Sequence, residues 1–197
     1  MIFSCNGISH ISHKAFSGMN LILDVDGTLI DSDDGDIIAR PYLAEFLIFV
    51  FKHFNTVSIW TNATPVWVNK VMDTVLVPLL PEGKNFYFVW TREKCVMERV
   101  VLHPRPYTRK PLSLVHEEYP TTHTSKNTVI VDDSPETYAH NLASAISIET
   151  FRWSYMPRNS DIEEDTTFEN CDNSSEEEVT DKELLRLIDD FQLAYFN

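Results

Sequence analysis

The chain has 197 residues, 43% of them hydrophobic and 12% aromatic, which suffices for the core of one ordinary domain. This composition excludes collagen-like, low-complexity and wholly disordered chains. The formal net charge is −14, but ten acids and no Lys or Arg lie between Asp161 and Asp181, so the rest of the chain carries only −4. An acidic surface repels polyanions, which argues against nucleic acid as a partner.

Short apolar strands alternate with helical patterns along most of the chain. The strands are predicted over residues 20–24, 56–60, 86–90, 128–131 and 145–148. Proline fits the first turn of a helix, and helices are predicted after Pro41, Pro65, Pro111 and Pro135. This alternation predicts an α/β sandwich with a mostly parallel sheet, whose ligand site lies beyond the carboxyl ends of the strands.

The C-terminal part divides into two segments. Residues 158–182 are acidic, rich in Ser and Asn and without apolar periodicity, which predicts a flexible segment or long loop. Residues 183–197 have apolar residues at helical spacing, so we expect a helix that docks on the body or, alternatively, binds a partner. The catalytic core is therefore expected within residues 1–157.

Three features bear on the compartment. Cys5, Cys95 and Cys171 are widely spaced and form no CxxC pair, which favours free thiols over a disulfide framework. The N-terminus lacks the basic and apolar regions of a signal peptide, and the apolar runs are too short to span a bilayer. We expect a soluble intracellular protein without a membrane partner, and leave nucleus and cytoplasm open.

Four polar clusters lie at the ends of predicted elements: Asp24-Val25-Asp26-Gly27-Thr28, Thr61-Asn62, Arg109-Lys110 and Asp132-Asp133. If the strands that precede the acids are neighbours, several carboxylates converge on one small volume. Their mutual repulsion is costly unless a cation lies among them. Carboxylate oxygens suit a hard cation, most simply Mg²⁺.

These residue types fit phosphoryl transfer. Asp24 can attack phosphorus and form an aspartyl-phosphate, while Asp26 gives a proton to the leaving oxygen and later takes one from water. Gly27 lets the backbone turn closely beneath the phosphate.

The remaining clusters supply binding groups. The Thr61 hydroxyl and nearby amides can hold a phosphoryl oxygen, and Lys110 adds positive charge. Asp133 would complete the metal shell, with Asp132 orienting either Asp133 or Lys110.

A basic run leads into Lys110. Six bases and two acids lie between Arg92 and Lys110, which indicates either a solvated face or a basic approach to the site. We favour the approach, because the run ends at a residue of the predicted site.

Six segments resemble successive motifs of one family: LILDVDGTLI, RPYLAEFL, VSIWTNAT, WTREKCV, RKPLSLV and VIVDDSPETY. They are similar to phosphatases that act on the C-terminal domain of RNA polymerase II, the NLI-interacting-factor-like branch of the haloacid dehalogenase superfamily. The resemblance covers residues 20–153 and resumes at DKELLRLIDDF. It implies a Rossmann-like three-layer sandwich and Mg²⁺-dependent dephosphorylation of phosphoserine or phosphothreonine in a protein, such as the polymerase tail.

The resemblance also implies roles for acidic positions. Asp24 matches the nucleophile, and Asp26 matches the acid/base whose backbone carbonyl also binds the metal. Asp133 matches the direct metal ligand, and Asp132 is its neighbour.

Phosphate and substrate contacts follow in the same way. Thr61 and Lys110 match phosphate-binding residues, and we assign Asn62, beside Thr61, to the same group. Arg92 matches an arginine near the substrate groove.

Three departures from the family pattern leave alternatives open. Gly27 replaces the usual Glu, only about ten residues separate Leu29 from Arg40 where relatives carry a pocket-forming insertion, and the acidic segment precedes the final helix. The same chemistry on nucleic-acid ends or small phosphometabolites is therefore an alternative, as is a catalytically weak binding module.

Overall fold

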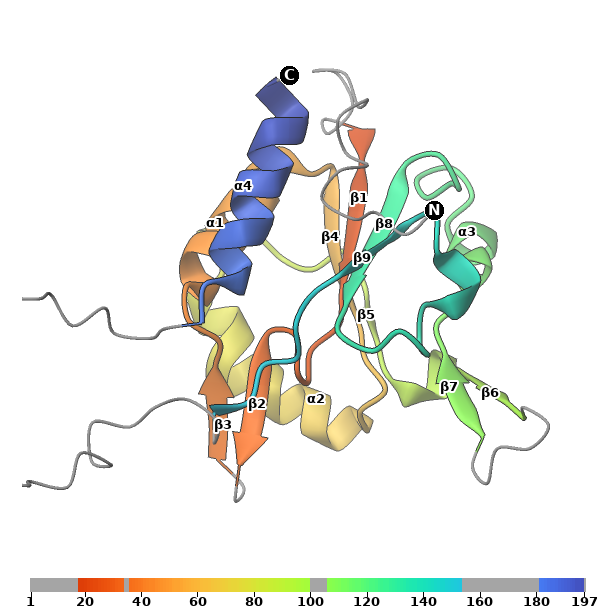
Figure 1. The fold of residues 1–197 in the computed structure, drawn as a ribbon, viewed down its shortest axis with the longest axis horizontal. Coiled ribbons are helices and arrows are strands. Elements are labelled where there is room, and N and C mark those ends of the chain that lie inside the picture. The colour runs from red at the N-terminus through yellow and green to blue at the C-terminus, as the bar shows by residue number, and fades with distance from the viewer. Residues whose placement is uncertain (1–17, 34–35, 100–105, 154–180, 197) are drawn as a thin grey trace, which may run out of the picture.

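The computed structural model describes residues 18–33, 36–99, 106–153 and 181–196. A five-stranded sheet with the order β5-β4-β1-β8-β9 forms its centre (Figure 1). All neighbouring strands in this sheet run parallel, which confirms the predicted α/β fold. The strands are β1 (Asn20–Leu23), β4 (Thr56–Trp60), β5 (Val89–Trp90), β8 (Thr128–Asp132) and β9 (Ala145–Ser147).

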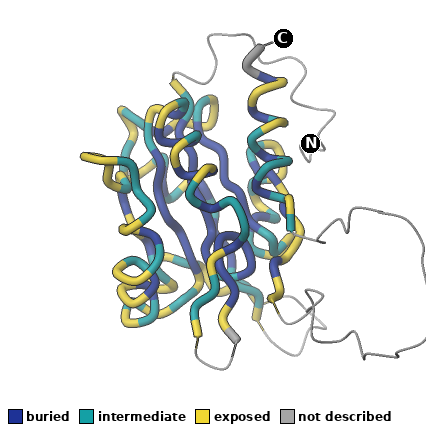
Figure 2. Tube along the Cα trace, turned by 90° about the vertical axis from the view of Figure 1, so that its left-hand side faces the viewer, coloured by how far each residue is buried: buried dark blue, intermediate teal, exposed yellow. Residues whose placement is uncertain are grey.

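The central strands are buried on both faces, as their continuous apolar sequences require. All four residues of β1 are buried, and Leu21 pairs with Val57 of β4 and Val129 of β8. Figure 2 shows the buried residues concentrated along the middle of the molecule. The polar residues that follow these strands therefore emerge together at one edge of the sheet.

Helices cover both faces of the sheet. On one face, α1 (Leu43–His53) and α4 (Glu183–Phe196) pack against a core that includes Leu21 and Leu23. The ring of Phe191 on α4 meets Phe54 edge to face, with centroids 5.2 Å apart. The opposite face, which carries Ile22, packs against α3 (Leu112–Glu118). The structure is thus a three-layer sandwich.

A buried arginine ties α4 to the site end of the sheet. Arg40 is 1% exposed and binds both carboxylate oxygens of Asp181, at 3.0 and 2.8 Å. Its guanidinium also donates to the carbonyls of Thr28 at 3.1 Å and Glu149 at 2.8 Å. Asp181 and Lys182 are the described residues of the predicted acidic segment; residues 158–180 lie outside the description.

The second predicted helix is shorter than its apolar pattern suggests. α2 (Pro65–Val71) passes into a π-helical turn (Met72–Leu76) and a 3₁₀ turn (Val77–Leu79). The N–H of Val77 bonds to the carbonyl of Met72, and Pro78, which follows, has no N–H to continue a helical ladder. None of the helices among the described residues is long and apolar enough to cross a membrane.

Two other predicted elements differ in the structure. The expected helix after Pro135 is wrong, because Thr137 donates its N–H and hydroxyl to the carbonyl of Ser134 and so forms a turn. A 3₁₀ turn (Ala139–Asn141) follows. The third strand is regular only at Val89–Trp90, rather than over residues 86–90.

Two hairpins that the sequence pattern did not predict flank the carboxyl ends of the strands (Figure 1). The first pairs β2 (Ile30–Asp33) with β3 (Asp36–Ala39), and the second pairs β6 (Val96–Glu98) with β7 (Tyr107–Arg109). The first hairpin occupies the short interval before Arg40. The second leads directly into Lys110.

Candidate active site

The first acidic cluster forms a tight turn after β1. The N–H of Asp24 still bonds to β8, at the carbonyl of Val131, at a distance of 3.0 Å. The carbonyl of Val25 then accepts the N–H groups of three successive residues, Thr28, Leu29 and Ile30, at 2.8 to 3.2 Å. This turn fixes Asp24 at the carboxyl end of the sheet, with its side chain only 8% exposed.

Gly27 is required within this turn. Its φ of +79° lies in the left-handed region, which L side chains rarely adopt. A Cβ at this position would lie 2.6 Å from Oδ2 of Asp133. The glycine that departs from the family pattern therefore gives Asp133 its place in this chain.

Lys110 lies between two carboxylates. Its Nζ donates to Asp24 Oδ1 and to Asp132 Oδ2, the latter at 2.7 Å, and the side chain is 1% exposed. Burial alone would lower the pKa of Lys110, but the two carboxylates raise it above its ordinary value. Asp132 thus contacts Lys110, as one of its two predicted roles requires.

Backbone contacts hold Lys110 from both sides. Its N–H donates to the carbonyl of Thr137 at 2.7 Å, and its carbonyl accepts the side-chain amide of Asn141 at 2.6 Å. The irregular segment after β8 therefore supports the lysine that leads into α3.

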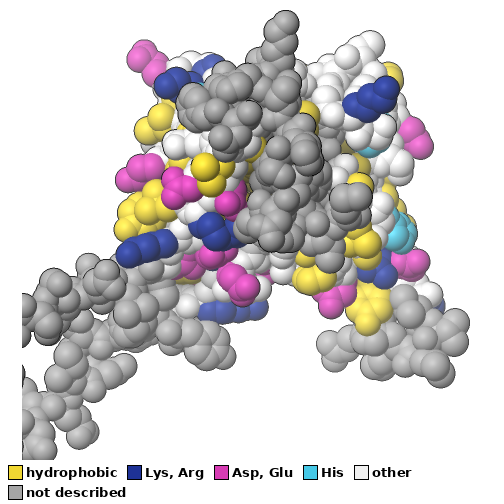
Figure 3. Space-filling view, turned by 45° about the horizontal axis from the view of Figure 1, so that its top comes forward, with side chains coloured by type: hydrophobic (Ala, Val, Ile, Leu, Met, Phe, Trp, Pro, Cys, Tyr) yellow, Lys and Arg dark blue, Asp and Glu magenta, His cyan; other side chains and the backbone are white. Residues whose placement is uncertain are grey.

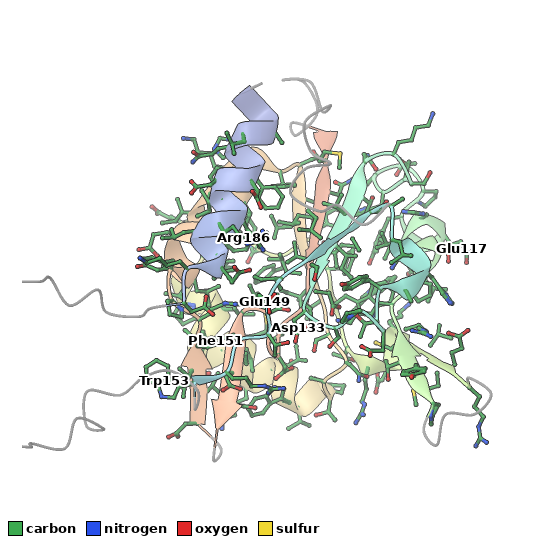
Figure 4. All side chains as sticks on the ribbon, viewed as in Figure 1. Glu117, Asp133, Glu149, Phe151, Trp153 and Arg186 are labelled. Carbon is green, nitrogen blue, oxygen red and sulfur yellow. The ribbon has the colours of Figure 1, made fainter. Side chains whose placement is uncertain are left out.

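Two hydroxyl groups position Asp133. Thr150 donates to its Oδ2 at 2.8 Å, and Thr28 lies 3.3 Å from both Asp133 Oδ1 and Asp24 Oδ2. Figure 4 places Asp133 beside the segment that carries Glu149 and Phe151. Thr28 consequently links the turn after β1 to the turn after β8.

The acids suit a hard cation. Ligand oxygens of Asp24, Asp132 and Asp133 all lie within 4.8 Å of one another. Burial raises the pKa of Asp24 to about 7, with Lys110 opposing the shift and Asp132 adding to it, and burial also raises the pKa of Asp133. A divalent cation would relieve this repulsion, and a carboxylate-only donor set favours Mg²⁺-like ions over softer metals.

Asp26 has a different environment. Its side chain is half-buried and lies outside that carboxylate cluster. The indole Nε1–H of Trp67 donates to Asp26 Oδ1 at 2.8 Å, and the Thr61 hydroxyl lies 3.4 Å from Asp26 Oδ2. Thr61 itself follows β4, where its Oγ1 accepts the N–H of Ala63 at 3.1 Å.

These groups share a pocket of about 530 Å³. Seven of the eight residues assigned to the site from sequence line it, and Asp133 adjoins it through Thr28. Asn62 and Arg92 are exposed at its wall, whereas Lys110 lies at its base. The lining residues are Asp24, Asp26, Ser32, Thr61, Asn62, Ala63, Thr64, Trp67, Arg92, Lys110, Asp132, Ser134 and Thr137.

The basic run does not form one surface. Of its described bases, Arg92 and Lys110 line the pocket, whereas Arg109 is mostly buried and pairs with Glu98. Lys94 pairs with Glu118 in solvent. On the face that Figure 3 shows, basic and acidic side chains are likewise interspersed. Among the described bases of the run, Arg92 and Lys110 thus lie at the pocket, and Arg105 lies outside the described residues.

Three supporting residues were not identified from sequence: Thr28, Trp67 and Thr150. Thr28 belongs to the first acidic motif, but its residue type alone indicates no role there. Trp67 belongs to the apolar pattern of a helix, and Thr150 follows the last strand without a motif. No sequence signal marked their contacts, because each bond joins segments brought together by the fold.

The structure is a parallel α/β sandwich with carboxylates and a threonine at the carboxyl ends of its central strands and a buried lysine beside them. This arrangement is the site that the sequence predicts for a phosphatase. Residues 19–189 match the family described as "NLI interacting factor-like phosphatase". The match covers most of the chain, and the protein belongs to this family. The resemblance seen in the motifs is thereby confirmed.

Curated relatives named "Ubiquitin-like domain-containing CTD phosphatase 1" are 27% identical in Danio rerio, 28% in Drosophila melanogaster and 27% in Homo sapiens. Each alignment spans 148 residues, which is 73% of this chain and 45% of the relative. The chain thus spans less than half the length of these relatives.

Among solved structures, a variant of fission yeast "RNA polymerase II CTD phosphatase Fcp1", bound to beryllium fluoride, is similar at 18% identity with a TM-score of 0.48. The alignment covers 71% of this chain and 42% of that one.

Proposed function

We propose that the protein is a Mg²⁺-dependent phosphomonoesterase that works through an aspartyl-phosphate on Asp24. The observation that carries this proposal is the placement of two unlike carboxyl groups in one pocket. Asp24 is buried against Lys110, and Asp26 faces the same pocket with neutral donors. One group suits nucleophilic attack, and the other suits proton transfer.

In the first step, a carboxylate oxygen of Asp24 attacks phosphorus, and the bond from phosphorus to the leaving oxygen breaks. Asp26 gives its proton to that leaving oxygen. Lys110 and the Thr61 hydroxyl stabilise charge on the phosphoryl oxygens, and the Lys110 ammonium holds Asp24 in place for attack.

In the second step, water attacks phosphorus and Asp26 takes its proton. The bond between phosphorus and Asp24 breaks, which releases phosphate and restores both carboxyl groups. Because Asp26 donates first and accepts later, each turnover returns it to its starting state.

The cation would be held by the side chains of Asp24 and Asp133 and by the backbone carbonyl of Asp26. When bound, it supplies positive charge that screens the approach of an anionic phosphate to an anionic nucleophile. Asp132 would position Lys110 rather than bind the cation, because its Oδ2 accepts a hydrogen bond from the Lys110 ammonium. Its Oδ1 accepts the N–H of Ser134 at 2.9 Å.

For substrate, we propose phosphoserine or phosphothreonine in a protein chain, with the C-terminal tail of RNA polymerase II as one candidate. The names of the curated relatives support a phosphoprotein substrate. The exposed Arg92 and Asn62 at the pocket wall offer contacts to groups that flank the phosphate.

The test compares wild type with Asp24→Asn on p-nitrophenyl phosphate, with and without Mg²⁺. We expect wild-type turnover that requires Mg²⁺ and no measurable turnover in the variant, with the circular dichroism spectrum unchanged. Undiminished turnover in Asp24→Asn would exclude the mechanism. A wild-type protein without Mg²⁺-dependent turnover would favour a binding module.

Substrate class needs a separate comparison. Values of kcat/KM for phosphoserine peptides, 5′-phosphorylated oligonucleotides and sugar phosphates should be highest for peptides. Higher values for oligonucleotides or sugar phosphates would assign the same chemistry to a different substrate.

A further inference from the structure

We propose that Trp67 is a positioning residue for Asp26: its indole N–H holds the Asp26 carboxyl in the orientation that delivers a proton to the leaving oxygen. This inference rests on the proposed function, because it assigns a partner to the acid/base of that reaction. Nothing in the family match or the motifs assigns a role to this tryptophan.

The tryptophan is itself firmly placed. It lies in the first turn of α2, where its backbone N–H faces the hydroxyl of the N-cap residue Thr64 at 3.4 Å. Its ring packs against the main hydrophobic core, and the ammonium of Lys70 lies 5.6 Å from the ring centroid. A half-buried ring held on two sides gives the N–H a defined direction.

The indole contact determines which Asp26 oxygen is free. An indole nitrogen only donates, so the Asp26 oxygen 2.8 Å away, Oδ1, must accept. The proton that Asp26 carries during turnover is then confined to Oδ2, on the side of Thr61. Thr61 is the predicted phosphate-binding residue, so this geometry directs the proton towards the phosphate ester.

The chemistry of the donor also matters. Asp24 is held by an ammonium, whereas Asp26 is held by a neutral N–H. A neutral donor fixes orientation without placing a positive charge beside a group that must bind and release a proton. The competing interpretation is that Trp67 is only an apolar wall of the pocket that contacts substrate.

The variant Trp67→Phe separates these interpretations, since it removes the N–H and keeps an aromatic ring. Phenyl phosphate has a poor leaving group that needs a proton, whereas p-nitrophenolate departs without one. We expect kcat/KM to fall about tenfold on phenyl phosphate and less than about threefold on p-nitrophenyl phosphate. Val66→Ala is the matched control, because Val66 is 82% exposed on the same helix and should change neither value.

A double-mutant cycle tests whether Trp67 acts through Asp26. Asp26→Asn should show the same dependence on the leaving group, only larger. Adding Trp67→Phe to Asp26→Asn should then cause no further loss, because the two residues form one unit.

A spectroscopic measurement provides a readout apart from turnover. The indole N–H resonance of Trp67, assigned by its loss in Trp67→Phe, should shift in Asp26→Asn. It should stay in place in Asp73→Asn, which changes an exposed acid further along the same helical segment.

Equal losses on both esters, additive losses in the cycle, or an unshifted resonance would each overturn the proposal and leave Trp67 as a wall of the pocket. A wild-type protein without turnover would instead overturn the proposed function, and this inference with it. An active wild type therefore tests the role of Trp67 alone.

Discussion

The two sides of the pocket differ in how they hold a carboxyl group. On the nucleophile side, named for the proposed role of Asp24, this residue is buried and shares the Lys110 ammonium with Asp132. On the acid side, named for the proposed role of Asp26, that residue is half-buried and bonds to the Trp67 indole, with the Thr61 hydroxyl nearby. A nucleophile must be ionised when it attacks, whereas an acid/base must exchange its proton. The fold provides charge compensation for the first and neutral orientation for the second.

Removing the ammonium should erase this difference and gives the largest expected effect. Lys110→Met leaves Asp24 and Asp132 buried without their counter-charge, which should lower the free energy of unfolding by about 3–5 kcal/mol. Turnover of p-nitrophenyl phosphate should fall by about 10²–10³-fold. Urea denaturation and steady-state kinetics measure the two effects.

The matched control is Lys94→Met, which removes an exposed ion pair with Glu118. It should change the free energy of unfolding by less than about 1 kcal/mol. If Lys110→Met were no more damaging than Lys94→Met, the charge compensation of the nucleophile side would be refuted.

The cation prediction sharpens the comparison, since the carboxylates proposed to hold the cation, Asp24 and Asp133, lie together in the acidic cluster that excludes the Asp26 side chain. In Asp133→Ala, the Mg²⁺ concentration for half-maximal activity should rise at least about tenfold. The increase in melting temperature on adding Mg²⁺ should shrink as well. Glu149→Gln, which changes an exposed acid in the neighbouring segment, should keep the wild-type response. Equal responses in the two variants would argue against Asp133 as a ligand.

Mg²⁺ should offset the pH dependence of stability that Asp24 causes in the metal-free protein. Because burial raises the pKa of Asp24 from 3.8 to about 7, the folded protein keeps a proton that the unfolded chain has lost in this range. Without Mg²⁺, this group should therefore lower the free energy of unfolding as pH rises through that range. Protons compete with the cation for Asp24, so stabilisation by Mg²⁺ should grow with pH.

Melting temperatures in Mg²⁺ and in EDTA, taken at about pH 5 and about pH 8, measure this linkage. A Mg²⁺ effect that is constant or smaller at the higher pH would contradict it. In Asp24→Asn, whose side chain at this position cannot titrate, the effect of Mg²⁺ on the melting temperature should lose most of its pH dependence.

The smallest effect is expected at the pocket wall, which belongs to neither side. Arg92→Glu should raise KM for a phosphopeptide about three- to tenfold while kcat changes less than twofold. Arg99→Glu is the control, because Arg99 carries the same charge but does not line the pocket. Added salt should reduce the difference between the variants, and an Arg92 effect that is equal at low and high salt would argue against an electrostatic role.

The parts of the site that follow buried strands were predictable from the sequence. Asp24, Thr61 and Asp132 each come at the carboxyl end of a buried strand, and parallel strands bring such ends to one edge of a sheet. The residues that contact them were harder to predict from the sequence. Trp67 reaches Asp26 only because the start of α2 lies beside the turn that follows β1, and this relation depends on tertiary packing.

Local competition explains the predicted elements that failed. Pro135 suggested a helix, but the hydroxyl of Thr137 favours a turn, and the carbonyl of Thr137 is needed by Lys110. The polar residues of the β2–β3 hairpin lack the alternation that marks a strand in sequence. These irregular segments border the pocket, where contacts to the site outweigh local propensity.

The most direct test of the central claim is to trap the phosphoryl group on the enzyme. Acid quenching during turnover, followed by peptide mass spectrometry, should find one added phosphoryl group on the peptide that contains Asp24. Neutral hydroxylamine should remove it, because an acyl phosphate is labile to this nucleophile. Turnover without a hydroxylamine-sensitive phosphoryl group on Asp24, or a trapped group on another residue, would contradict the proposed mechanism.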